Sequence, residues 1–141
     1  MSRSPPLKQN ILAERLLGYE IDLGDEPAAF RVCEKLRQVL GKLLGTAGFQ
    51  ALLARALTLA RAEAPALRAV KINAQGSLEG LSQLEPRARG GRVSKGEVVL
   101  VATLLGLLVT FIGEALTQRL VEDAWPEASL DGLAREKGTK S

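Results

Sequence analysis

One apolar run limits what this chain can fold into more than any other feature. It extends from Val98 to Gly113, sixteen residues without a charge, and is bounded by Glu97 and Glu114. A helix rises about 1.5 Å per residue, so the run forms a helix about 24 Å long. A bilayer core is about 30 Å thick, which makes the run short for a transmembrane helix. A helix that is apolar on every side must be surrounded by protein or by lipid. We expect protein, with membrane insertion as the main alternative.

The composition agrees with a single globular domain. A chain of 141 residues can bury about two-thirds of its unfolded surface, and 46% apolar with 25% charged residues is typical of soluble proteins. The net charge of +3 does not by itself indicate a nucleic-acid or membrane partner. The single cysteine excludes an intrachain disulfide, and because polar residues follow the N-terminus we expect no signal sequence. We therefore expect a cytoplasmic location, with membrane association as the alternative.

Hydrophobic periodicity predicts helices in the first half of the chain. The first extends from Leu7 to about Gly18, and the alternating residues 19–23 then indicate an extended connector or a short strand. The second is expected over 27–44 and the third over 49–64. The short glycine-containing link 45–48 makes these two an antiparallel helical hairpin.

The second half of the chain is predicted to contain a ribbon, a loop and a long helix. Residues 70–73 and 77–78 are candidates for a two-stranded β-ribbon, and 86–96 for an exposed basic loop. Ser94 and Glu97 have capping-box spacing directly before the apolar run. The last helix is expected to continue to about Ala124, where a Trp-Pro pair stops it.

These elements predict an all-α fold with one domain. It is a small helical bundle in which the hairpin packs on a long apolar C-terminal helix, with a minor two-stranded β-ribbon. Residues 1–6 are expected to be a flexible N-terminus, 7–126 the helical domain and 127–141 a flexible tail.

A narrow strip of mostly small residues follows one side of the last helix. At 100° per residue, it contains Thr103, Gly106, Thr110, Gly113, Glu114 and Thr117. Small side chains let another backbone approach closely, and buried threonines can bond to carbonyls one turn earlier. We predict that this strip, the interaction seam, contacts a partner. Glu114 lies at its edge, where a buried carboxylate would need a partner or a proton. We expect an ion pair with Arg37, Arg55 or Arg61 of the hairpin, the alternative being a polar pocket or switch.

Few groups in this sequence could carry out catalysis. It has no histidine, the commonest general base and a frequent metal ligand. Cys33 lies among apolar residues at helical spacing and is expected in the core. No glycine-rich phosphate loop is present, and the acidic residues at 20, 22, 25 and 26 lack the EF-hand pattern. We expect a non-enzymatic protein without a cofactor or a metal.

Basic residues provide candidate anion contacts. Those in the loop are Arg87, Arg89, Arg92 and Lys95, and a second positive stripe on the second helix contains Arg31, Lys35 and Lys42. No aromatic residue lies between the loop arginines, as single-strand recognition would usually require. A solvated loop and a solvated helix face are the simpler interpretation.

The absence of catalytic groups and the surplus of aliphatic residues favour a protein–protein interaction or regulatory module. We expect it to self-associate as a homodimer through its apolar C-terminal helix, with no small-molecule substrate. The first alternative is a small membrane-associated or membrane-inserting protein that uses residues 98–113. The second is a weak nucleic-acid binder that uses the basic residues 87–95.

Overall fold

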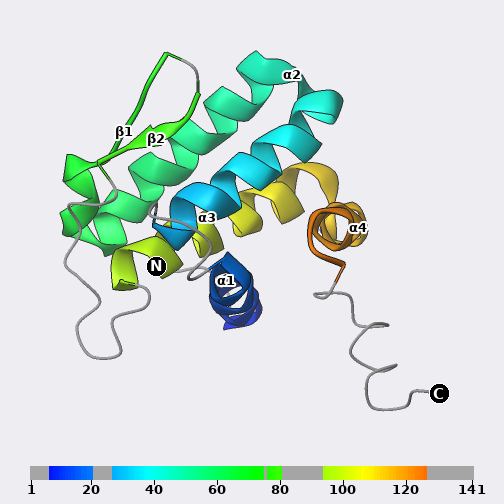
Figure 1. The fold of residues 1–141 in the computed structure, drawn as a ribbon, viewed down its shortest axis with the longest axis horizontal. Helices are drawn as coiled ribbons and strands as arrows, with labels where there is room; N and C mark the ends of the chain where they lie inside the picture. Colours follow the sequence, from blue (N-terminus) through cyan, green and yellow to red (C-terminus); the bar gives the residue numbers. More distant parts are fainter. Residues whose placement is uncertain (1–6, 21–26, 75, 81–93, 127–141) are drawn as a thin grey trace.

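The computed structural model describes residues 7–20, 27–74, 76–80 and 94–126. Within these ranges the helices are α1 (Leu7–Glu20), α2 (Ala28–Glu63), the 3-10 helix η1 (Pro65–Ala69), α3 (Lys95–Ile112) and α4 (Glu114–Ala124). Two short strands, β1 (Lys71–Ile72) and β2 (Leu78–Glu79), form an antiparallel pair. Figure 1 shows α2 and α3 side by side, with α1 and α4 against them. The predicted helical bundle with a minor ribbon is confirmed.

Helix α2 consists of two helices joined at Gly45. This residue has φ 81° and ψ 161°, a conformation that essentially only glycine adopts. Figure 1 shows the chain reversing direction at this point. The helical hairpin is therefore present, but its link is shorter than the predicted 45–48, since helix resumes directly after Gly45.

Helix α3 supplies the centre of the core. Ser94 caps its N-terminus, because the Ser94 hydroxyl oxygen accepts a hydrogen bond from the Glu97 N–H at 3.2 Å. Leu100, Leu104 and Leu108 are buried at helical spacing. The apolar run is thus largely surrounded by protein along its first three turns.

Among the described residues, two helices are long and apolar enough to cross a membrane, α2 and α3. In α2, every 18-residue stretch with no more than two charged residues includes Gly45, where the helix reverses. In α3, half of the apolar window is buried inside the protein. Length and composition alone therefore do not distinguish these helices from core helices of a soluble bundle.

The predicted continuous helix from Glu97 to Ala124 is wrong. It is interrupted at Gly113, which has φ 92° and ψ 155°, and α4 departs from there in a different direction (Figure 1). The bend lets Thr117, Val121 and Trp125 pack on the core. A straight helix would carry these three side chains into solvent.

Two boundaries also differ from the sequence-based expectation. Tyr19 and Glu20 belong to the last turn of α1 and not to an extended connector. Lys95 and Gly96 belong to the first turn of α3 and not to the basic loop. The end of α1 is stabilised by the tertiary contact of Glu20 with Trp125, and the start of α3 by the Ser94 cap, which places Lys95 and Gly96 in its first turn.

The β-ribbon rests on both halves of α2. Lys71 pairs with Glu79 and Ile72 with Leu78. The Ser77 hydroxyl donates to the Glu34 carboxylate at 2.7 Å, which fixes the ribbon to the first half of α2. This support explains why so short a pair of strands forms at all.

Gly80 closes the ribbon, and we expect Gly80→Ala to destabilise the protein by about 2 kcal/mol. Its φ is +92°, and an added Cβ would lie 2.4 Å from the Ala69 carbonyl oxygen. Urea denaturation measures the effect. Gly18→Ala is the matched control, because Gly18 is helical with no atom within 4 Å of a Cβ. This control is expected to stabilise the protein by about 0.5 kcal/mol. Equal free energies of unfolding for Gly80→Ala and the unaltered protein would contradict the prediction.

Candidate interaction surface

Three of the four exposed large apolar side chains among the described residues lie at one end of the molecule. Phe111 is 62% exposed, Leu43 50% and Leu116 37%. In Figure 1, α3 runs in the same direction as the first half of α2. The two helices start beside each other, where the Ala29 N–H donates to the Glu97 carboxylate. Leu43 follows Ala29, and Phe111 follows Glu97, by the same fourteen residues. Both side chains therefore lie about 21 Å along the bundle from that contact.

The predicted interaction seam is divided by the bend at Gly113. Thr103 is buried within the bundle, and Thr117 is buried on α4. The remaining seam residues face outward: Gly106 is partly exposed, and Thr110, Gly113 and Glu114 are exposed. At Gly106 an added Cβ would meet no atom within 4 Å, so no described backbone approaches it closely. We call the outward part of α3, Gly106, Leu107, Thr110 and Phe111, the α3 surface.

The seam threonines behave differently from one another. The Thr110 hydroxyl donates to the Gly106 carbonyl at 3.1 Å, as expected for a helical threonine. The Thr117 hydroxyl is buried and has no hydrogen-bond partner among the described residues.

The apolar surface does not continue around Glu114, the condition under which its carboxylate would have been buried. Glu114 is exposed in the first turn of α4, where a carboxylate favours the positive end of the helix dipole. Two of its expected partners bind elsewhere: Arg37 pairs with Glu34, and Arg61 donates to the carbonyls of Leu67 and Val70.

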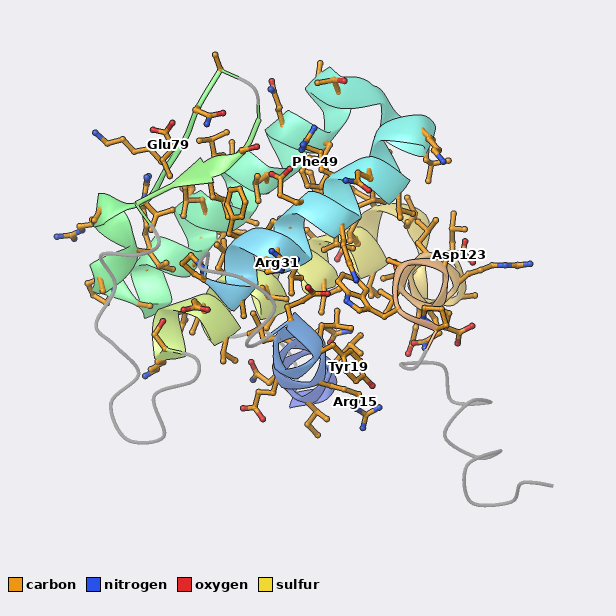
Figure 2. The ribbon with its side chains drawn as sticks, in the orientation of Figure 1. Arg15, Tyr19, Arg31, Phe49, Glu79 and Asp123 are labelled. Atoms are coloured by element: carbon orange, nitrogen blue, oxygen red, sulfur yellow. The ribbon has the colours of Figure 1, made fainter. Side chains whose placement is uncertain are left out.

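The buried carboxylate is instead Glu20, which is only 1% exposed. One carboxylate oxygen accepts from the Trp125 indole N–H at 2.7 Å and pairs with the Lys35 ammonium at 2.9 Å. The other pairs with the Arg31 guanidinium at 3.3 Å. The Lys35 ammonium also lies 5.3 Å from the centre of the Trp125 ring, within cation–π range. We call these four residues the tryptophan clasp, because they join α1, α2 and the end of α4. In Figure 2, Arg31 lies where α1 meets the first half of α2.

The clasp sets the charge state of Glu20. Burial alone would raise the pKa of this carboxyl, but hydrogen bonds from Lys35 and Trp125, together with the charge of Lys35 and a bond from Arg31, outweigh burial and lower it. Glu20 is therefore ionised at neutral pH. Its negative charge at the C-terminus of α1 opposes the helix dipole, and the two cations compensate for this.

A second buried carboxylate, Glu97, links α3 to α2. One of its oxygens accepts from the Ala29 N–H at 3.3 Å, and the other from the Ser94 hydroxyl at 3.4 Å. The N-cap of α2 is Pro27, whose side chain makes no capping bond. Glu97 thus caps a helix other than its own, a contact that the capping-box spacing did not predict.

The basic residues fall into three groups. Arg87, Arg89 and Arg92 lie outside the described residues, so the structure does not place these candidate anion contacts. Lys95 is exposed at the start of α3. Arg31 and Lys35 bind Glu20 and do not form the predicted exposed stripe, of which only Lys42 is exposed.

Among the residues that the structure describes, few side chains could carry out catalysis. Cys33 is buried, and burial together with the nearby charge of Glu34 raises its thiol pKa to about 12, which disfavours the reactive thiolate. In the described ranges, no group of three or more histidine, cysteine, aspartate or glutamate residues could hold a metal ion. The acidic residues Asp22, Asp25 and Glu26 lie outside those ranges.

No protein-family model matches this sequence, and no curated protein or solved structure is significantly similar to it.

Proposed function

We propose that this protein is a self-associating interaction module whose two copies join through the α3 surface. The observation that supports this is the position of Phe111, an exposed aromatic ring beside the open strip at Gly106 and Thr110. Monomeric proteins rarely expose large contiguous apolar patches, and such patches commonly mark binding sites.

The α3 surface offers both a projection and a hollow. Phe111 projects, and the absence of a side chain at Gly106, five residues before it on the outward part of α3, leaves open space. In a two-fold symmetric dimer, each copy presents the same surface, so each Phe111 ring meets the Gly106 strip of its partner. Leu43 and Leu116 extend the apolar area at the same end of the bundle.

Association with a lipid surface is the second candidate function. The same exposed apolar end supports it, together with the two helices that are long and apolar enough to cross a membrane. Lys42 is exposed directly before Leu43, where an ammonium group could contact an anionic headgroup.

We expect Phe111→Ser to abolish dimer formation. The unaltered protein should have about twice the chain mass of 15.1 kDa by light scattering after size exclusion, and the variant the chain mass itself. The loss of two buried rings per dimer should weaken the dimer at least about a hundredfold. Gly106→Leu should have the same effect by filling the hollow, without destabilising the monomer, since this position is open.

Ile11→Ser is the matched control, because Ile11 is 49% exposed on α1 and lies outside the α3 surface. It should leave the dimer intact. If the unaltered protein is a monomer at the highest concentration tested, self-association is refuted. Flotation with vesicles of phosphatidylcholine and phosphatidylserine then decides the lipid alternative, which predicts binding that Phe111→Ser removes.

A further inference from the structure

The connection between α3 and α4 consists of the single residue Gly113. Its φ of 92° and ψ of 155° lie in a region that is essentially closed to other residues. It is exposed, and no atom lies within 4 Å of the position that a Cβ would occupy. Backbone conformation is therefore the main local feature that makes glycine necessary here.

The sequence on either side of Gly113 encodes one straight helix. A capping residue starts it at Ser94, and Trp125 with Pro126 ends it after Ala124. Periodicity predicts no interruption between them, and Gly113 is compatible with helix at the modest cost that any helical glycine carries. The bend must therefore be maintained by the contacts that α4 makes with the rest of the bundle.

The polar part of those contacts is concentrated at the C-terminal end of α4, while Leu120 and Ala124 pack partly buried against the core. The helix itself buries only Thr117 and Val121, and the Thr117 hydroxyl lacks a partner among the described residues. Trp125 makes the main polar contact, through the clasp with Glu20 and Lys35. We call the surface of the bundle on which α4 packs the α4 site. The largest fully buried side chain in this contact is that of Trp125.

We propose that two copies of this protein can exchange α4. The proposal rests on the hinge at Gly113, on a sequence that favours one straight helix, and on the attachment of α4 through Trp125. Gly113 becomes helical, Lys95 to Ala124 form one helix, and α4 occupies the α4 site of a second copy, where Trp125 binds the partner's Glu20. Exchange preserves every contact that α4 makes and changes only the hinge. This dimer is distinct from the one formed through the α3 surface and does not depend on it.

Gly113→Ala tests the exchange, carried out in a Phe111→Ser background so that the α3 surface contributes nothing. Alanine disfavours the bent hinge and favours helix, and it meets no atom at this open position. An exchanged dimer contains two hinges, and the substitution in each should lower the dissociation constant of the dimer about tenfold. Together they should lower it about a hundredfold. Gly106→Ala in the same background is the matched control, because it raises helix propensity within α3 without affecting the hinge. A double variant that stays at the chain mass under all concentrations tested would overturn the proposal.

A mixing experiment distinguishes exchange from dimers of any other kind. One copy carries Glu20→Gln and the other Trp125→Phe, both with Gly113→Ala and Phe111→Ser. In an exchanged heterodimer, Trp125 of the first copy enters the intact Glu20 site of the second, which restores one complete clasp. The heterodimer should then melt several degrees above both homodimers. Trp125 is the only tryptophan of the chain and is absent from the second copy, so the emission of the heterodimer comes from that clasp alone and should differ from the emission of the Glu20→Gln homodimer.

If the mixture shows only the two melting transitions of the parent proteins, no clasp has formed between chains. This result would refute exchange. If circular dichroism shows that Gly113→Ala is unfolded, the Phe111→Ser protein with glycine at 113 is used instead. It is unfolded in acid at high concentration and returned to neutral pH. A slowly dissociating dimer supports exchange, and recovery of monomer alone overturns it.

Discussion

Trp125→Ala is expected to destabilise the protein by about 4 kcal/mol, more than we expect for Glu20→Ala or Gly80→Ala. The indole is fully buried, donates a hydrogen bond to Glu20 at 2.7 Å, and lies beneath the Lys35 ammonium. Its removal leaves a cavity and takes one donor from a buried carboxylate. Urea denaturation followed by circular dichroism measures the loss, since the variant contains no tryptophan.

Trp125→Phe separates the two contributions. Phenylalanine keeps most of the ring but not the N–H group, so it should cost about 1.5–3 kcal/mol, the value of a hydrogen bond to a charged group. A loss below about 1 kcal/mol for Trp125→Ala would contradict the prediction. It would mean that α4 is anchored mainly by Thr117 and Val121.

The second large effect is expected at Glu20, where Glu20→Ala should cost about 3 kcal/mol at neutral pH. The substitution leaves the Trp125 N–H buried without its acceptor and removes the carboxylate that Arg31 and Lys35 both bind. The two cations are partly exposed and can be hydrated, which keeps the cost below that of a fully buried pair. Glu20→Gln should cost less, because the amide oxygen can still accept from the indole.

The contribution of Glu20 should disappear in acid. The folded protein lowers the pKa of this carboxyl below its ordinary value of 4.5, so the unfolded chain takes up the proton first as the pH falls. The stability that Glu20 provides is therefore complete above about pH 4.5 and is lost as the pH falls through the lower folded pKa. The difference in free energy of unfolding between the unaltered protein and Glu20→Gln should narrow over this range. A difference that stays constant from neutral pH down to well below the ordinary pKa would show that the ionised carboxylate does not stabilise the fold.

The clasp connects stability to the two proposed modes of self-association. Contact through the α3 surface uses Phe111 and leaves α4 in place, whereas exchange uses Gly113 and requires the clasp to open. Substitutions in the clasp should therefore increase the rate of exchange without changing association through the α3 surface. Phe111→Ser therefore tests association through the α3 surface, and Gly113→Ala tests exchange.

The helices of this fold could be predicted because their signals are local. The stripe that includes Leu36 and Leu40 predicts the first half of α2, and Ser94 with Glu97 predicts the start of α3. Of the seam, the bond from the Thr110 hydroxyl to the Gly106 carbonyl follows from helical spacing, whereas the exposure of Thr110 beside the buried Thr103 does not. The surroundings of Glu114 do not follow from the periodicity, because the helix bends at Gly113 and the apolar surface does not continue around this carboxylate.

The buried carboxylates could not be predicted from the sequence. Glu20 resembles one more acid of a polar connector, and its partner Trp125 lies 105 residues away. Glu97 matches a capping box, but nothing local indicates that it also caps α2 at Ala29. Both sites depend on which helix ends meet, which is a property of packing.

The sequence by itself determined where helices form, which faces are apolar and where glycine permits a bend, because propensity, periodicity and capping act over a few residues. Only the tertiary structure decided that Gly113 bends while the equally permissive Gly106 remains helical. The physical reason is that a bend at Gly113 brings Trp125 to Glu20 and Val121 into the core. The local sequence leaves the bent and the helical conformation at a glycine close in free energy. Contacts between residues far apart in the chain then select one of them.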